Sequence, residues 1–222
     1  MLVQIKYVLG KKELQHVRKL LETAEFREGR FSAGLSARQV KHTEEVGNEK
    51  PDSELNQLVV GNLTRHPEYK LAALPHRIAV PFYVRYRQGM HYGEHIDDPV
   101  MGEGSRYRSD IAITVFLNSP DEYEGGELVI HTPFGVQHIR YPAGDAVLYP
   151  ASTRHHVTPV SYGERLVAVT WVQSLVRSDE RRNLLYQLGR TRERLLRKNP
   201  DCEDTKRVDN VYVNLVRMWG ET

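Results

Sequence analysis

The chain has 222 residues, a formal net charge of +2, 27% charged residues and 40% hydrophobic residues. These values are ordinary for a globular protein, so they exclude a wholly disordered or fibrous chain, and the nearly balanced charge gives no field over the whole molecule that would attract nucleic acid. The single cysteine, Cys202, excludes an intramolecular disulfide and zinc sites built from Cys-x-x-Cys pairs.

The N-terminal part of the chain, residues 1–76, has the pattern of a flanking region with two helices. Apolar residues at helical spacing predict one helix over 11–24 and a weaker second helix over 53–65, and Pro75 then breaks the chain. The apolar run after Met1 is too short for a signal sequence, and no stretch of the chain approaches the ~20 apolar residues of a membrane span. We therefore expect a cytoplasmic protein without membrane contact.

Short runs rich in Val, Ile, Tyr and Phe dominate residues 77–174. Gly, Pro, Asn or Asp separate these runs, and the pattern is typical of an all-β sandwich or barrel. The turn after Val160 would fold the preceding strand back antiparallel to the strand that begins at Arg165. The predicted strands are 77–86, 110–117, 127–132, 136–141, 145–149, 155–160 and 165–172.

Residues 175–222 contain two helical patterns. Asp179 and Glu180 are typical of the first turn of a helix, and the residues after them are expected to form a C-terminal helical extension that packs on the β domain and could form a homodimer. The many arginines of the first helix alternate with Leu and Glu as on a solvated face, so we expect no nucleic-acid partner. The apolar positions are Leu184, Leu185, Leu188, Leu195 and Leu196 in the first helix, and Val208, Val211, Tyr212, Leu215 and Trp219 in the second.

A His-x-Asp pair follows the first predicted strand. In an extended chain His95 and Asp97 point to the same side and can hold one ion. Such a pair alone is more often part of a solvated loop, so a metal site requires a third ligand. His155 and His156 open a later strand, and strand alternation allows only one of them to point inward.

Two histidines and one carboxylate are the ligand set of non-haem Fe(II) oxygenases, in which three protein ligands leave the other positions of the ion open. Zinc accepts the same ligands, so the ligands alone do not exclude a hydrolase, although no general base is evident beside them. A cupin-like sensor that binds metal or 2-oxoglutarate without turnover is a further alternative.

Arg165 favours the oxygenase. It shares one face of its predicted strand with Val167, Val169 and Trp171. An arginine on an apolar inward face is a costly buried charge unless a carboxylate meets it, and a dicarboxylate co-substrate would supply that partner. Alternatively, Arg165 ends its strand in water or pairs with Glu164.

Three ordered motifs and this arginine resemble the Fe(II)/2-oxoglutarate dioxygenases of the prolyl-hydroxylase type, and in particular the bacterial PKHD-type hydroxylases. The resemblance covers residues 77–174 as the dioxygenase domain, and the continuation over 172–181 is also similar to that subfamily. The matching segments are His95-Ile-Asp97, Tyr123-Glu-Gly-Gly-Glu-Leu128, and Ser152-Thr-Arg-His155-His-Val157-Thr-Pro-Val160 followed by Gly163-Glu-Arg165.

The resemblance implies a mainly-β double-stranded β-helix, or jelly roll, that binds Fe(II) and 2-oxoglutarate. In it His95, Asp97 and His155 are the iron ligands, and Arg165 binds the distal carboxylate of 2-oxoglutarate. His156 is then the outward neighbour. The implied activity is the hydroxylation of a substrate that no motif identifies, with consumption of dioxygen and release of succinate and CO2. The resemblance also implies L-ascorbate as supporting reductant and a connection with iron uptake or homeostasis in a bacterium.

Three aromatic residues bear on the co-substrate pocket. Tyr86 and Trp171 match positions that line this pocket in related prolyl hydroxylases, although both could be core aromatics. Some relatives have a tyrosine before a Leu-Asn pair that assists the arginine. This chain has Phe116 there, which puts a second hydroxyl contact in doubt.

Overall fold

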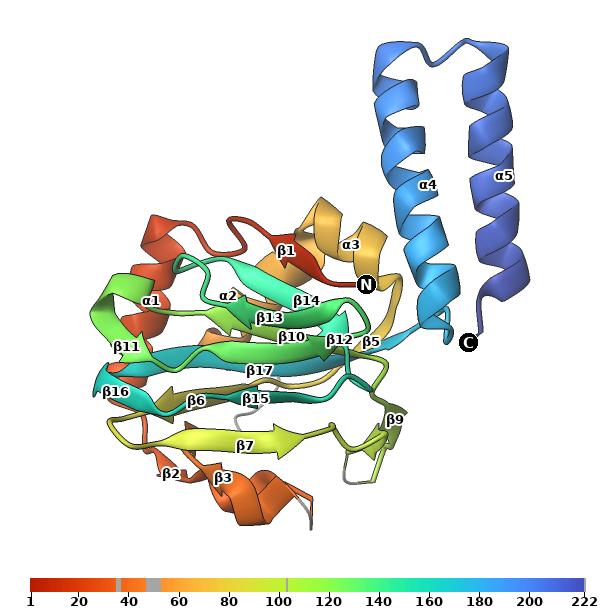
Figure 1. The fold of residues 1–222 in the computed structure, drawn as a ribbon. Helices are drawn as coiled ribbons and strands as arrows, with labels where there is room; N and C mark the ends of the chain where they lie inside the picture. Colours follow the sequence, from red (N-terminus) through yellow and green to blue (C-terminus); the bar gives the residue numbers. More distant parts are fainter. Residues whose placement is uncertain (35–36, 47–52, 103, 222) are drawn as a thin grey trace.

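Two antiparallel β-sheets form the body of the protein in the computed structural model (Figure 1), which describes residues 1–34, 37–46, 53–102 and 104–221. The larger sheet has eight strands in the order β1-β14-β10-β17-β6-β4-β2, with β5 paired to β17. Its strands are β1 (Val3–Ile5), β2 (Arg27–Glu28), β4 (Glu44–Val46), β5 (Pro75–Ile78), β6 (Phe82–Tyr86), β10 (Ile111–Phe116), β14 (Ala146–Pro150) and β17 (Arg165–Ser174).

The smaller sheet has five strands in the order β13-β12-β15-β7-β3. Two short ribbons, β11-β16 and β8-β9, complete the strands of the described residues. The smaller sheet consists of β3 (Lys41–His42), β7 (His91–His95), β12 (Leu128–Thr132), β13 (Gly135–Ile139) and β15 (His155–Val157), and the ribbons of β8 (Val100–Met101), β9 (Tyr107–Arg108), β11 (Tyr123–Gly125) and β16 (Val160–Gly163).

The space between the two sheets is filled by alternate side chains from both of them. Residues of β6, β10, β14 and β17 meet residues of β12 and β15 in one apolar cluster that includes Val84, Val147, Val167, Ile130 and Val157. Because successive strand residues point to opposite faces, the other set of side chains of the larger sheet is free to pack against helices. The mainly-β double-stranded β-helix expected from the sequence is therefore confirmed.

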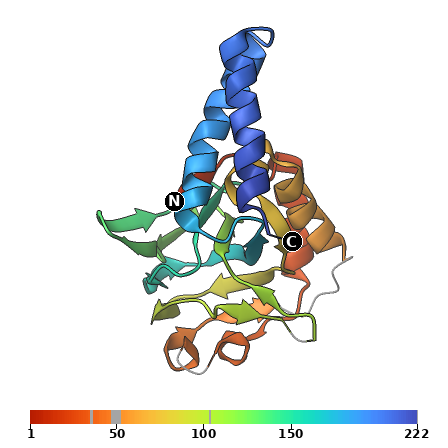
Figure 2. The same ribbon diagram turned by 90° about the vertical axis from the view of Figure 1, so that its right-hand side faces the viewer.

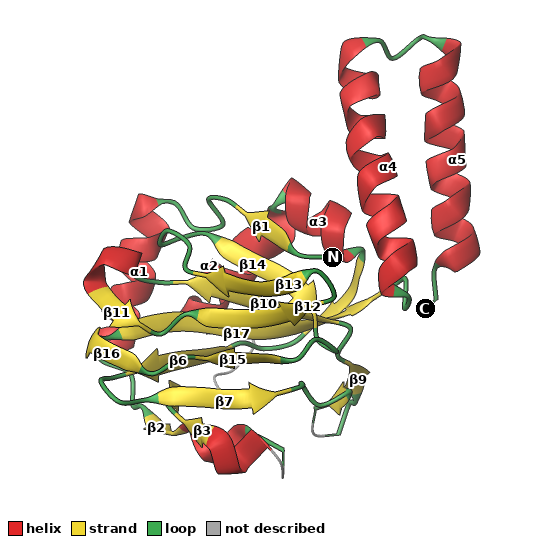
Figure 3. Cartoon of the chain, viewed as in Figure 1, coloured by secondary structure: helices red, strands yellow, loops and turns green. Residues whose placement is uncertain are grey.

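Helices cover the outer face of the larger sheet, as Figure 3 shows. The predicted helix over 11–24 is α1 (Lys11–Glu22), and the one over 53–65 is α2 (Glu54–Arg65). Ser53 caps the N-terminus of α2, because its side chain accepts a hydrogen bond from the Asn56 backbone N–H. The sequence did not indicate α3 (Pro67–Ala73) or the 3-10 turns η1 (Gly29–Ser32), η2 (Ala37–Val40) and η3 (Pro120–Glu122). The N-terminal region also supplies strands to both sheets. No helix of the described residues is long and apolar enough to cross a membrane.

The C-terminal helices α4 (Asp179–Lys198) and α5 (Glu203–Trp219) form an antiparallel hairpin that projects from the β body (Figure 2). Leu185 and Tyr212 join them to Leu71 of α3 and Val176 in a small apolar cluster at the base of the hairpin. Two expected members of the apolar stripes face solvent instead, since Leu184 is 57% and Val211 51% exposed. The helices are thus confirmed, but their buried stripe is narrower than the sequence pattern suggested.

Two of the predicted strands are interrupted. The run 77–86 is split into β5 and β6 around Pro81, which has no N–H to donate to a strand ladder. The run 155–160 ends at Val157, because Pro159 interrupts it before β16 begins at Val160.

The expected hairpin between the strands that begin at His155 and Arg165 is wrong. β15 pairs with β12 and β7 in the smaller sheet, whereas β17 pairs with β10, β6 and β5 in the larger one. The short strand β16, which pairs with β11, carries the chain from one sheet to the other. His155 and Arg165 therefore approach one cavity from opposite sheets.

Gly189 offers a test of how the C-terminal hairpin packs. A Cβ at this position would come within 2.5 Å of Leu71 Cδ1 and 3.0 Å of Tyr212 Cε2. We expect Gly189→Ala to lower the free energy of unfolding by ~1–3 kcal/mol through overpacking. The matched control is Gly61→Ala in α2, where a Cβ would meet only the flexible end of Arg65, at 3.4 Å, so it should be neutral or stabilising by ~0.5–1 kcal/mol. Equal urea midpoints for the two variants would contradict this packing.

Candidate metal and co-substrate site

His95, Asp97 and His155 come together between the two sheets. His95 ends β7 and His155 begins β15, and these two residues are direct partners across the antiparallel pair. One possible ligand atom from each of the three residues lies within 4.8 Å of the others. Asp97 Oδ1 is 3.8 Å from His95 Nε2 and 3.9 Å from His155 Nε2. The three side chains are thus arranged around one point.

Backbone carbonyls orient both imidazole rings in the same way. His95 Nδ1 is 2.8 Å from the Gly93 carbonyl oxygen, and His155 Nδ1 is 2.8 Å from that of Thr153. A carbonyl can only accept, so each Nδ1 carries the hydrogen and each Nε2 presents a lone pair towards Asp97. Such a hydrogen bond on the far nitrogen is typical of metal-binding histidines.

Burial determines the charge states of the group. It lowers the pKa of His95 to about 3, with the electrostatic interaction with His155 as a smaller cause, so His95 is neutral at ordinary pH. Burial also raises the pKa of Asp97, an effect that His155 opposes. Asp97 Oδ2 is buried and makes no hydrogen bond within the described part of the chain. A divalent cation between neutral imidazoles and this carboxylate would satisfy all three ligands, so the donor set fits Fe(II).

His156 does not belong to this group. Strand alternation turns its side chain to the opposite face of the smaller sheet, whereas His155 is 5% exposed and points inward. Only one member of the pair faces the cavity, as strand alternation predicts.

Arg165 approaches the same cavity from the larger sheet. It begins β17, opposite Tyr86 of β6, and is only 1% exposed. Its Nε and Nη1 atoms are buried and make no hydrogen bond among the described residues. The guanidinium carbon lies 4.8 Å from the centre of the Tyr86 ring and 5.8 Å from that of Phe116. Arg165 therefore does not end in water, and Glu164 lies instead beside Arg85 and Arg87.

A cavity of about 1270 Å³ connects these groups. The three possible metal ligands, Arg165, Tyr86 and Trp171 all line it. Burial raises the pKa of Tyr86 to about 12, against the opposing charge of Arg165, so the hydroxyl stays protonated and can donate a hydrogen bond. Trp171 Nε1 is buried without a hydrogen-bond partner in the described chain. Both aromatics are thus cavity residues in addition to core residues.

Three further residues that the sequence pattern did not indicate line the cavity. Tyr149 on β14 packs edge-on against His155, with ring centres 5.1 Å apart, and its inward direction follows from alternation with the buried Val147. Lys41 and Glu45 form a buried ion pair supplied by the N-terminal region, and the Lys41 ammonium lies 5.2 Å from the centre of the Tyr92 ring. These two come from very short strands, for which periodicity gives no signal.

Two segments of the chain match known protein families. Residues 81–173 match the 2OG-Fe(II) oxygenase superfamily, and residues 179–221 match the PKHD-type hydroxylase C-terminal domain. The first segment contains the His95, Asp97 and His155 group together with Arg165. The second contains the helical hairpin α4–α5.

Solved structures with a similar fold include two prolyl hydroxylases. A prolyl-4-hydroxylase of Pseudomonas putida has a TM-score of 0.58 at 16% identity, with 78% of this chain and 92% of that chain covered. A prolyl hydroxylase of Trichoplax adhaerens, in complex with a peptide fragment of the hypoxia-inducible factor oxygen degradation domain, has a TM-score of 0.58 at 16% identity, with 83% and 86% covered. HygX of Streptomyces hygroscopicus, with nickel, 2-oxoglutarate and hygromycin B bound, has a TM-score of 0.56 at 12% identity, with 79% and 84% covered. At these identities the likeness concerns the fold alone.

Two bacterial relatives match over their full length. A PKHD-type hydroxylase of Thioalkalivibrio sulfidiphilus is 51% identical, and one of Paraburkholderia phymatum is 40% identical, each with 100% of both chains covered. Such identity over whole chains, together with both family matches, places the protein in one family. The chain belongs to the PKHD-type hydroxylases, which are 2-oxoglutarate- and Fe(II)-dependent oxygenases.

Proposed function

We propose that His95, Asp97 and His155 hold the Fe(II) of this hydroxylase and that Arg165 binds the distal carboxylate of 2-oxoglutarate. The observation that carries the proposal is the buried guanidinium of Arg165, which lacks a hydrogen-bond partner among the described residues on two of its nitrogens and lines the same cavity as the three ligands. A buried charge of this kind costs free energy unless a counter-ion reaches it. A dicarboxylate that also touches the metal ligands would remove that cost.

Each protein group has a defined task in this arrangement. The Gly93 and Thr153 carbonyls hold the two histidine Nε2 atoms towards the metal position, and Asp97 supplies a negative charge there. Fe(II), when bound, supplies the redox chemistry by which dioxygen oxidises 2-oxoglutarate and the substrate.

The far end of the co-substrate meets Arg165 and its aromatic neighbours. The guanidinium can donate two parallel hydrogen bonds to one carboxylate. The protonated hydroxyl of Tyr86, in the same wall, can donate a further one. This hydroxyl could take the place of the contact that Phe116 cannot make.

The primary substrate is either a small molecule or a side chain of a peptide or protein. The cavity extends past the metal position to residues of η1 and of the β8–β9 ribbon, among them Phe31, Met101 and Tyr107, so it has room beyond the co-substrate. The peptide bound to the Trichoplax adhaerens neighbour and the hygromycin B bound to HygX illustrate both classes on this fold.

Other expectations from the sequence and from the resemblance stay predictions. These are ascorbate as supporting reductant, a connection with iron uptake or homeostasis, a cytoplasmic location and a homodimer through α4 and α5. A sensor that binds 2-oxoglutarate without turnover would use the same residues, so release of succinate is the property that distinguishes an active hydroxylase from it.

Substitution of His155 and of His156 tests which of the two neighbouring histidines binds the metal. We expect His155→Ala to abolish the visible charge-transfer band that arises when a 2-oxo acid chelates protein-bound Fe(II), because the ion loses one of three ligands. His156→Ala is the matched control, since it changes the adjacent residue on the other face, and it should retain the band. The measurement is an anaerobic Fe(II) titration with excess 2-oxoglutarate. A band lost in His156→Ala and kept in His155→Ala would reverse the assignment.

Substitution of Arg165 tests its proposed contact with 2-oxoglutarate. Arg165→Ala should weaken 2-oxoglutarate binding to the anaerobic Fe(II) form by a cost of ~2–5 kcal/mol, because one partner of a buried charge pair is removed. This corresponds to roughly a thirtyfold to several-thousandfold loss of affinity. Arg165→Lys should rescue binding only in part, since an ammonium cannot reproduce the planar two-point contact.

The control for this experiment is Arg87→Ala, which removes a half-exposed arginine at the end of the neighbouring strand, outside the cavity lining. It should leave the affinity for 2-oxoglutarate within about twofold of wild type, because surface charges contribute little. Wild-type affinity in Arg165→Ala would refute the co-substrate role of this residue.

A further inference from the structure

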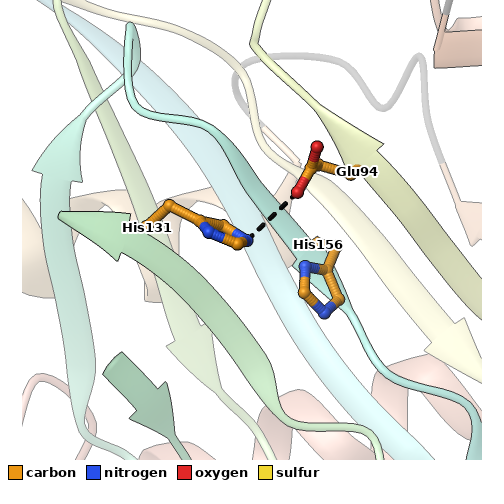
Figure 4. A group of neighbouring side chains, drawn as sticks. All are labelled: Glu94, His131 and His156. Atoms are coloured by element: carbon orange, nitrogen blue, oxygen red, sulfur yellow. Dashed lines mark ion pairs between the residues drawn. The ribbon is translucent and has the colours of Figure 1, made fainter. Parts of the chain in front are cut away.

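The outer face of the smaller sheet carries a second cluster of possible metal ligands. Glu94 on β7, His131 on β12 and His156 on β15 converge there, as Figure 4 shows. Glu94 and His156 are chain neighbours of His95 and His155, so strand alternation turns them to the opposite face of the sheet. The two clusters therefore lie back to back across the same two strands.

The geometry of the outer cluster matches that of a metal site without its ion. One ligand atom from each residue lies within 4.8 Å of the others, and His131 Nε2 is 3.2 Å from Glu94 Oε2. His131 Nε2 and His156 Nδ1 are both buried, and neither makes a hydrogen bond with any described residue. Buried polar atoms are nearly always hydrogen-bonded, so the His156 nitrogen, and a His131 nitrogen that meets Glu94 in a close contact without hydrogen-bond geometry, require an explanation.

We propose that Glu94, His131 and His156 bind a divalent transition-metal ion of the zinc, nickel or copper type. Imidazole suits these ions, and two histidines with one glutamate form a three-ligand site whose fourth position is left to water. Tetrahedral ligands at ~2.0–2.1 Å from zinc lie about 3.3 Å from one another. The ligand atoms must therefore approach one another by about 1.5 Å at most, through small rotations of the three side chains, of which Glu94 is half-exposed and His131 and His156 are partly exposed.

Arg154 opposes this binding and sets its strength. Its Nη1 atom is 3.4 Å from Glu94 Oε1, and its side chain is 57% exposed. The guanidinium repels an incoming cation and competes with it for the Glu94 carboxylate. A solvent-exposed ion pair of this kind contributes little to stability, however, so the arginine can turn into water when a metal ion binds. The proposal therefore predicts opposite effects for neighbouring residues: loss of His131 removes the site, whereas loss of Arg154 strengthens it.

An ion in this position would link three consecutive strands of the smaller sheet. His131 and Glu94 belong to β12 and β7, which are separated by β15, and His156 lies on β15 itself. β7 and β15 are also the strands that present His95 and His155 to the cavity. A metal that binds the folded sheet and not the unfolded chain raises thermal stability by mass action, so occupancy of the outer site stabilises the strands that support the inner one.

The number of zinc ions bound per chain tests this site. Zinc should also enter the inner group of two histidines and one aspartate, so the two sites are counted together and then separated by variants. After dialysis against Zn²⁺ and then against metal-free buffer, we expect two zinc ions per wild-type chain by elemental analysis. His131→Ala and Asp97→Ala should each retain one, and the double variant none. Glu94→Gln provides a second variant that should also retain one, in case His131→Ala alters folding. Arg154→Gln should bind the outer ion severalfold more tightly.

The control is His16→Ala, because His16 and Glu54 form an exposed pair, 2.9 Å apart, outside either three-residue cluster. This variant should retain two ions. Two ions in both His131→Ala and Glu94→Gln would overturn the proposal. One ion in wild type that is lost in His131→Ala and kept in Asp97→Ala would support the outer site and contradict the inner one, so the two assignments fail separately.

Discussion

Two opposite charges, the guanidinium of Arg165 and the carboxylate of Asp97, are buried in one cavity and are only partly satisfied by the described residues around them. Either charge alone would favour unfolding, because desolvation of an ion is not recovered without a partner. The rest of the structure holds both in place. The larger sheet supplies the arginine, and the smaller sheet with the residues just after β7 supplies the proposed metal ligands, so a metal ion together with an anionic ligand would satisfy both ends at once.

The period of the β-strand explains how one sheet can carry two kinds of surface. At the ends of β7 and β15, each inward histidine of the proposed site has a chain neighbour that points outward and can also bind metal. Glu94 precedes His95, and His156 follows His155. A shift of one residue in register would exchange the two faces. The pairing of His155 with His95 therefore determines both the cavity and the outer cluster.

Much of this arrangement could be predicted from the sequence, because it depends on local periodicity. The helices α1 and α2, the strands of five or more residues other than β7, and the inward direction of His155 all follow from alternation or helical spacing in short segments. The His-x-Asp pair is equally local, since His95 ends β7 and Asp97 follows two residues later. Trp171 shares a strand face with Arg165, and both line the cavity as that spacing predicts.

The prediction of which distant strands pair with one another was wrong. The hairpin expected between the strands of His155 and Arg165 does not form, because β16 crosses to the other sheet, and no local pattern carries that information. Lys41 and Glu45 reach the cavity from a region expected to contribute helices, through strands too short to show a period. Val211 satisfied the helical pattern, yet it faces solvent, because α5 packs along one side only.

The proposal that Arg165 binds the distal carboxylate of 2-oxoglutarate is tested most directly by changing the ligand and leaving the protein unchanged. 2-Oxopentanoate has the same length as 2-oxoglutarate and keeps the metal-chelating 2-oxo acid group, but a methyl group replaces the distal carboxylate. Anaerobic titration of both into the Fe(II)-loaded wild-type protein should show 2-oxoglutarate binding at least about thirtyfold more tightly, which corresponds to ~2 kcal/mol. Equal affinities would mean that Arg165 does not bind the distal carboxylate.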